Sequence, residues 1–361
     1  MLNKKNHIII LKKSTLYAFT ICLMLMLAVC SESSVSAAEK ALKLCAENII
    51  PSLFPFFVLS QFLIFTGFAN YGGKFLSPIM RPLFNTNGAG GIAFLIGLIC
   101  GYPSGAKTIS ELYKAGMLEK KEAERLLPYC NNSGPLFIIG AVGVGILKDS
   151  QAGVFLYIVH ILSAIITGIC FRFFSTKKQK TISRLCSNGY MNTGEAFSKS
   201  IKDSVSSILS VCGFVVFFSS VTAPFSALLK NNLWGLIFQS IAEVTGGVLR
   251  VAESFDLDKA LPLISAILGF GGVCVLLQVM GIVKTESLSM KPYFWGKVFQ
   301  GGVSYVLCKE SLKKNIAVST FSVSNTINFE TGNLGAAITS VFIICAFYFL
   351  ILALRKNFKK D

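Results

Sequence analysis

The chain has 361 residues, of which 53% are hydrophobic and only 14% are charged, and its formal net charge is +16. A soluble domain carries about a quarter charged residues, so this composition excludes an ordinary soluble protein and predicts an integral membrane protein. The basic residues cluster between apolar segments, as the positive-inside rule requires, and no motif for reading nucleic-acid grooves accompanies them. We therefore expect the lipid bilayer, and no nucleic acid, as a partner.

Charge-free runs long enough to cross a bilayer, about 17 to 25 residues, recur along the chain. In chain order they are Ser14–Ser31, Ile49–Gly73, Pro82–Ala106, Leu126–Leu147, Ser150–Phe171, Ser204–Leu229, Ala260–Val283 and Thr331–Leu354. Two weaker segments, Asn231–Leu249 and Tyr293–Cys308, hold Glu243 and Lys297. The sequence predicts an all-α polytopic membrane protein with about eight transmembrane helices and two re-entrant or broken segments.

Composition and loops divide the chain into six regions. The first, residues 1–37, is expected to be a transmembrane segment; it also resembles a signal peptide, but the spans that follow favour an uncleaved helix. The other regions are a first repeat (38–174), a cytoplasmic basic linker (175–200), a second repeat (201–308), a polar loop (309–330), and a C-terminal transmembrane helix with a basic tail (331–361).

Similar motifs occur in the same order in the two repeats. Gly101–Gly105 and Asn131–Pro135 of the first repeat correspond to Glu243–Gly247 and Gly269–Gly272 of the second. Their shared order favours an internal duplication. If both termini and the linker are cytoplasmic, each repeat needs one re-entrant segment to return the chain to the correct side. The repeats would then have inverted topology, as in many secondary transporters.

The segment Gly101–Lys107 closes a charge-free run, Pro82–Ala106, that contains six glycines. A proline and glycines there are typical of a half-helix that ends inside a membrane and leaves backbone amides free for a solute. On that interpretation Ser104, Gly105 and Lys107 bind an anionic group. The alternative is close helix packing through small residues, with a lysine at the membrane interface.

A second polar interruption, Cys130–Pro135, opens another apolar run. Asparagines in an apolar segment must find partners, so Asn131, Asn132 and Ser133 are predicted to line a path for a solute or an ion. The alternative is a capped junction between a loop and a helix, with the proline in its first turn.

In the second repeat, Glu243 is predicted either to relay protons or bind a coupling cation inside the membrane, or to be solvated in an interfacial hairpin. The glycines at 269–272 mark either an unwound break or a close helix crossing. The candidate solute contacts of this repeat are Thr245, Gly246, Gly271 and Gly272. His160, alone in its apolar run, is interpreted as a packed helix residue more than as a ligand.

No set of nucleophile, base and acid is present, and no P-loop, zinc-protease or dinucleotide motif. We therefore expect no enzyme. The eleven cysteines include no Cys-x-x-Cys pair and only two histidines accompany them. Neither a metal site nor a cofactor is expected.

Three stretches together resemble the sporulation integral membrane protein YlbJ family: Gly-Tyr-Pro-Ser-Gly-Ala-Lys (101–107), Cys-Asn-Asn-Ser-Gly-Pro-Leu-Phe-Ile-Ile-Gly-Ala-Val-Gly (130–143) and Gly-Phe-Gly-Gly-Val-Cys (269–274). The resemblance covers residues from about Ala38 to Cys308. It implies that the two repeats are gate-like, or nucleoside-recognition-like, domains of an endospore-forming bacterium. It also implies a role in moving dipicolinic acid from the mother cell across the mother-cell-derived outer forespore membrane.

The leading hypothesis is a membrane transporter of a small organic anion, most of all dipicolinate. This planar aromatic dianion would suit freed amides, hydroxyls, Lys107 and abundant phenylalanine, 31 in the chain. The alternatives are a nucleoside-type permease and a non-transporting membrane scaffold or regulator of spore maturation. Association with other sporulation membrane proteins and formation of a homo-oligomer stay open.

Overall fold

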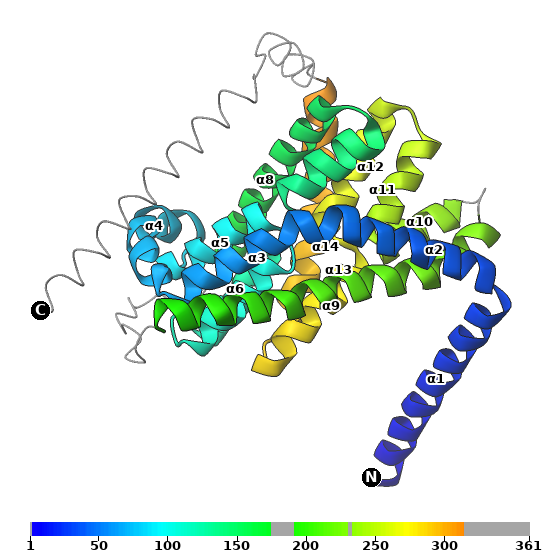
Figure 1. Ribbon diagram of the computed structural model, residues 1–361, viewed down its shortest axis with the longest axis horizontal. Coiled ribbons are helices and arrows are strands. Elements are labelled where there is room, and N and C mark those ends of the chain that lie inside the picture. The colour runs from blue at the N-terminus through cyan, green and yellow to red at the C-terminus, as the bar shows by residue number, and fades with distance from the viewer. Residues whose placement is uncertain (1, 175–190, 230–232, 314–361) are drawn as a thin grey trace, which may run out of the picture. The chain divides into compact units, whose positions relative to one another are not determined.

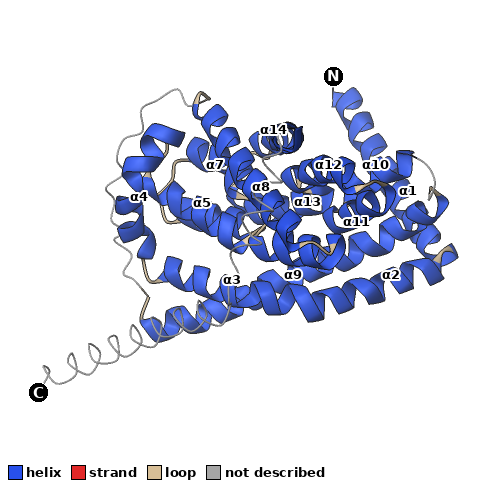
Figure 2. Ribbon diagram, turned by 90° about the horizontal axis from the view of Figure 1, so that it is seen from above, coloured by secondary structure: helices blue, strands red, loops and turns tan. Residues whose placement is uncertain are grey.

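The structure is a computed structural model that describes residues 2–174, 191–229 and 233–313. Within these ranges the chain forms helices joined by short loops, and no strand is present (Figure 2). This confirms the all-α prediction for the described residues. The C-terminal helix predicted at 331–361, most of the polar loop at 309–330 and most of the linker at 175–200 lie outside them.

The N-terminal helices bend and then run along one long helix. α1 (Leu2–Val29) meets α2 (Ser31–Leu44) at 91°, and η1 (Cys45–Ile49) leads into α3 (Ile50–Phe65). α2 and α3 pack against α9 (Thr193–Leu228), beside which they lie in Figure 1. The helix α2 thus continues through residue 37, the expected end of the first region, and α9 begins inside the expected linker.

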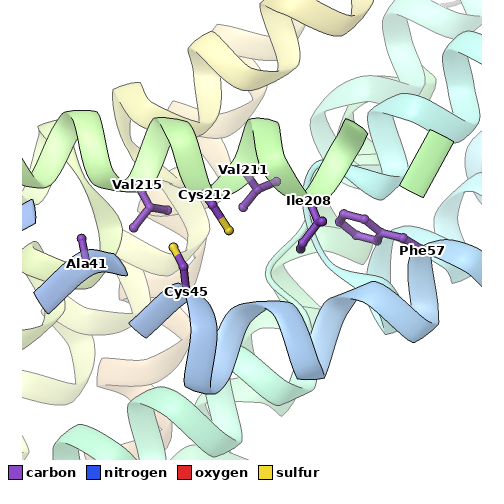
Figure 3. Packing of buried hydrophobic residues seen from close by; sticks show 7 residues of the cluster. All are labelled: Ala41, Cys45, Phe57, Ile208, Val211, Cys212 and Val215. Atoms are coloured by element: carbon purple, nitrogen blue, oxygen red, sulfur yellow. The ribbon is translucent and has the colours of Figure 1, made fainter. Parts of the chain in front are cut away.

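A small apolar core joins these helices. Figure 3 shows the side chains of α2, η1 and α3 pointing at those of α9, with the thiols of Cys45 and Cys212 side by side. The buried members are Ala41, Cys45, Phe57, Ile208, Val211, Cys212 and Val215. Burial of these side chains holds the N-terminal helices to the first helix of the second repeat.

The first repeat continues through six further elements. They are α4 (Phe68–Phe84), α5 (Gly88–Cys100), α6 (Ser104–Lys114), α7 (Lys120–Cys130), η2 (Leu136–Leu147) and α8 (Ser150–Arg172). Side-chain caps fix two of the starts, because Asn87 accepts a hydrogen bond from the third residue of α5 and Asp149 accepts two at the start of α8.

The second repeat follows the same plan after α9. Its elements are α10 (Leu233–Ala242), α11 (Val244–Ser254), α12 (Leu257–Phe270), α13 (Gly272–Val283), η3 (Lys284–Glu286) and α14 (Lys291–Lys313). α12 ends at Gly271, whose φ of +84° an L side chain rarely adopts, so the glycine allows the chain to turn there and restart as α13.

Four elements of one repeat, α6, α7, η2 and α8, match α11, α12, α13 and α14 of the other. α6 and α11 each have 11 residues, η2 and α13 each have 12, and α8 and α14 each have 23. Each of these elements packs against the element of the other repeat that its counterpart's partner matches. Thus α6 packs against α13 as η2 packs against α11, and α7 packs against α14 as α12 packs against α8. α8 and α14 pack against each other, and in Figure 2 α14 is seen near the upper edge, above α8.

Within the described residues, three helical segments are long and apolar enough to cross a membrane: Ser150–Arg172, Thr193–Phe225 and Leu257–Glu286. Two bent pairs, Lys13–Val29 with Ser31–Glu47 and Tyr71–Phe84 with Gly88–Cys100, raise the number to five if each pair is one span. The predicted total of about eight spans stays a prediction.

Candidate functional site

Two interruptions of the helical backbone form the first part of the candidate site. α5 ends at Cys100 and α6 begins at Ser104, and Gly101 between them has a φ of +77°. α7 ends at Cys130 and η2 begins at Leu136. Both interruptions fall where the sequence motifs predicted them.

Glycines allow these two breaks to touch. A Cβ atom on Gly97 or Gly105 would collide with the main-chain carbonyl of Cys130, and a Cβ on Gly101 would lie 2.9 Å from the amide nitrogen of Gly134. The backbones therefore meet without side chains between them. Gly105 serves this close packing, which is the alternative interpretation of its motif, and its contact with a solute stays a prediction.

The three polar residues of the second break lie at the centre of this crossing. Asn131, Asn132 and Ser133 are all 1% exposed or less. The Asn131 side chain accepts from the amide of Ala106 in α6 at 3.4 Å and donates from Nδ2 to the hydroxyl of Tyr293 in α14 at 3.0 Å. It thus ties the break to an element more than 160 residues later in the chain.

Helix α14 brings a buried lysine to the same break. Lys297 is 2% exposed, and its Nζ donates to the main-chain carbonyl of Asn131 at 2.9 Å and to Oε1 of Gln300 at 2.7 Å. Gln300 in turn donates from Nε2 to Oδ1 of Asn132 at 3.0 Å. No carboxylate oxygen of the described residues lies within 4.0 Å of the lysine. The cation is therefore held by neutral acceptors.

The same lysine also reaches the second repeat. A Cβ atom on Gly271, at the break between α12 and α13, would lie 3.8 Å from Cε of Lys297. The lysine thus stands between the Asn131 break of one repeat and the Gly271 break of the other. This is the place where the two halves meet.

A histidine on α8 lies beside the lysine-bound break. The main-chain N–H of Ser133 donates to Nε2 of His160 at 3.1 Å, so in the neutral ring the proton is on Nδ1. His160 is 1% exposed, and its Nδ1 has no hydrogen-bond partner among the described residues. A buried N–H donor without an acceptor costs about 1–3 kcal/mol unless a ligand or water satisfies it.

Lys107 and Ser104 lie apart from this centre, in a small hollow between α3, α6 and α9. The Lys107 Nζ donates to the main-chain carbonyl of Asp203 at 3.1 Å and to Oγ of Ser207 at 2.7 Å. Among the described residues, Oγ of Ser104 and Oε1 of Gln61 are buried without partners. The lining residues are Phe57, Ser60, Gln61, Pro103, Ser104, Lys107 and Ser207.

In the second repeat the acidic residue caps a helix. Glu243 is 7% exposed, and its carboxylate accepts from the amides of Thr245 at 2.8 Å and Gly246 at 2.6 Å. This is the stabilising interaction of an anion with a helix N-terminus. Gly272 lies next to that break, because its Cβ would be 3.3 Å from the carbonyl of Ile241. The two candidate motifs of this repeat are therefore neighbours, as the two of the first repeat are.

Sequence reasoning missed the contribution of α14. Tyr293, Lys297, Gln300 and Ser304 are all buried and recur every three or four residues. Such spacing places them on one face of a helix, and a polar face in an otherwise apolar helix is the signal that indicates an internal polar site. His160, which was expected to be a packed helix residue, is buried, and its Nε2 also accepts a hydrogen bond from the main-chain N–H of Ser133.

Among the residues that the structure describes, no group of three or more His, Cys, Asp or Glu side chains is arranged to hold a metal ion. The polar groups of the centre are amides, hydroxyls, an imidazole and an ammonium. Such a set supplies mainly hydrogen-bond donors and a positive charge, which suit an anion.

A comparison with known proteins identifies the family. The chain is 31% identical to the sporulation integral membrane protein YlbJ of Bacillus subtilis (strain 168), over 75% of this chain and 75% of that protein. The chain belongs to the YlbJ family. No protein-family model matches it, and no solved structure matches it. The match and the apolar helices establish that this YlbJ-family protein is an integral membrane protein with a role in sporulation.

Proposed function

We propose that this YlbJ-family protein transports a small organic anion, with dipicolinate as the leading solute, rather than catalysing a reaction. The solute would move from the mother cell toward the forespore across the mother-cell-derived outer forespore membrane. The observation that carries the proposal is the crossing of broken helices in the protein interior. Irregular backbone at membrane depth is tolerated only where it is buried in protein or lines a solute path.

The repeated plan of the chain supports alternating access. The exchanged contacts of α6 with α13 and of η2 with α11 are those expected of two units related by a two-fold axis, which supports this part of the proposal. In secondary transporters of inverted topology, substrate sites lie at such repeat interfaces near the bilayer midplane. We propose that the repeats are inverted, with the linker on the cytoplasmic side and Glu32–Glu47 on the opposite side.

The charges of the described interior favour an anion. Lys107 and Lys297 are both partly or fully buried with neutral acceptors, while Glu243 is bound by two amides of its own helix. A buried cation is costly and tends to be functional. A dianion such as dipicolinate would offset that cost, whereas an uncharged nucleoside would not.

Uptake by proteoliposomes tests this proposal. The full chain, reconstituted in vesicles, is expected to accumulate radiolabelled dipicolinate above the level of protein-free vesicles, and unlabelled uridine in excess should not compete. Competition by uridine would support the nucleoside permease instead. Absence of both uptake and binding would support a scaffold or regulatory role and overturn the proposal.

The hollow near α9 gives a sharper test of the predicted site. Lys107→Gln removes a charge-assisted hydrogen bond, so the apparent affinity for dipicolinate should fall about ten- to hundredfold. Lys284→Gln, at an exposed lysine, is the matched control. Unchanged uptake by Lys107→Gln would show that this lysine is not a solute contact.

A deletion strain tests the physiological part. Cells without the protein, and without a second relative, are expected to synthesise dipicolinate but to form spores that lack it. Spores with normal dipicolinate content would contradict the proposed solute.

A further inference from the structure

We propose that Lys297 is a carboxylate-binding residue of this protein, at the meeting point of its two repeats, and that His160 Nδ1 is a second donor to the same anion. The inference rests on the proposed transport of an organic anion, and it assigns the charge recognition to two residues outside the sequence motifs. It names a carboxylate of a small planar acid as the ligand group.

The first argument is the unbalanced charge. Removal of an ammonium group from water costs several kcal/mol unless an opposite charge or a full set of hydrogen bonds compensates it. An ammonium group has three N–H donors, and Lys297 uses two of them, toward Asn131 and Gln300. The third donor and the whole positive charge are left for a ligand.

The second argument is the neighbouring donor. The Asn131 carbonyl binds the lysine and the Ser133 amide binds His160, so one three-residue segment holds both side chains. His160 Nδ1 is a fully buried N–H without an acceptor among the described residues. Within the described part of the chain, two donors without acceptors lie at this break and no carboxylate contacts them, an arrangement that favours an anion over a metal ion or an organic cation.

The third argument is the position. Lys297 contacts the break of the first repeat through its Nζ and approaches the break of the second at Gly271. Gly271 has no side chain, so at that position none lies against the end of the lysine. An anion bound there touches both halves, which is what a solute must do if a movement between the halves is to carry it across.

A purely structural role is the competing account, in which Lys297 only ties α14 to the Asn131 break. The two accounts differ in charge dependence. A structural tie needs hydrogen-bond donors of the right length, whereas an anion site needs the positive charge.

Binding measured on the purified full chain separates these accounts. In detergent, dipicolinate and its uncharged dicarboxamide analogue are titrated by calorimetry against the wild type, Lys297→Gln and the control Lys309→Gln, an exposed lysine on the same helix. Lys297→Gln is expected to lower the affinity for dipicolinate about ten- to hundredfold. Lys309→Gln should bind as the wild type does, and the analogue should bind weakly to all three.

A second variant keeps the test valid if Lys297→Gln does not fold. Gln300→Glu retains the oxygen that accepts from Lys297 and places a carboxylate against the ammonium group. The lysine stays paired within the protein, so dipicolinate should lose most of its affinity, while the thermal unfolding midpoint shows that the variant is folded. Wild-type affinity in folded Gln300→Glu would overturn the inference.

The outcomes also separate this inference from the proposed function. If dipicolinate is bound and transported equally by the wild type and Lys297→Gln, the assignment of Lys297 is wrong and the transport proposal stands. If another planar carboxylate, such as benzoate or phthalate, binds in a Lys297-dependent way and dipicolinate does not, the assignment stands and the proposed solute is wrong.

Discussion

The two repeats build the same crossing of broken helices and then use opposite charges in it. At the break of the first repeat, the main-chain carbonyl of Asn131 accepts from the ammonium group of Lys297, which has no carboxylate partner among the described residues. In the second, the carboxylate of Glu243 accepts from two amides of the helix that it starts. The positive charge at the first break therefore has no opposite charge beside it, whereas the negative charge at the second is stabilised by the amides of its own helix.

This difference distinguishes the features that both repeats need for folding from those that occur in only one of them. Close backbone contact through glycines occurs at both crossings, at Gly105 in one and Gly272 in the other, so it belongs to the fold. The third N–H of Lys297 and Nδ1 of His160 lie at the first crossing without an acceptor among the described residues, and there we propose that the solute binds. A duplicated fold can thus keep one copy of a feature for stability and the other for binding.

The largest expected effect is a change at the glycine crossing itself. Gly105→Ala would drive a methyl group into the Cys130 carbonyl, a rigid main-chain atom, and should destabilise the protein by about 1–3 kcal/mol or more. Gly213→Ala, with open space around it on α9, is the control. The thermal unfolding midpoints of both variants are measured in detergent. Equal midpoints would show that the backbones at Gly105 and Cys130 can move apart at no cost in stability.

A change at the capping carboxylate should have the next largest effect. Glu243→Ala leaves the amides of Thr245 and Gly246 without their acceptor, at a cost of about 0.5–2 kcal/mol. Glu253→Ala, at an exposed position near the other end of α11, should cost little. If Glu243 only caps the helix, the affinity for dipicolinate stays normal. A loss of transport with unchanged unfolding would instead support its predicted role as a coupling-ion or proton site.

A smaller effect is expected where the two long helices of the repeats touch. Ser163 and Ser304 occupy the same position in α8 and α14, counted from the first residue of each, and Oγ of Ser304 donates to Oγ of Ser163 at 2.8 Å. A double-mutant cycle with alanine at each site should give a coupling energy of about 0.5–1.5 kcal/mol. A coupling near zero would mean that this contact does not join the repeats.

The smallest effect is expected at an ion pair between the repeats. Lys114 at the end of α6 lies 3.1 Å from Glu286 in η3, with the two side chains 46% and 16% exposed. Lys114→Gln should cost about 0.2–1 kcal/mol, and the loss should shrink at high salt. Lys313→Gln, which breaks the more exposed pair with Glu310, is expected to cost less. The reverse order would contradict a link between the repeats here.

The helical breaks could be predicted because their causes are local. Glycine and proline at 101–105, and paired asparagines at 131–132, interrupt a helix wherever they occur in it. The order of such motifs also indicated the two repeats. The polar nature of the centre followed for the same reason, since buried asparagines need partners that only an internal site can supply.

The partners themselves could not be predicted, because they come from distant parts of the chain. Nothing near Asn131 in the sequence points to Lys297, which lies 166 residues later. The role of Glu243 depended in the same way on the exact start of α11: one residue earlier or later, its carboxylate would not reach two free amides. The spacing of polar residues in the sequence shows which side chains share one face of a helix. Which residues that face contacts depends on how the helices pack.

The separation of 166 residues between Asn131 and Lys297 also has a consequence during synthesis of the chain. The carbonyl of Asn131 and the side chain of Asn132 emerge from the ribosome long before the lysine and glutamine that bind them. Until α14 is made, these groups need water or a temporary partner. The first repeat alone therefore lacks the partners that these two groups have in the complete structure.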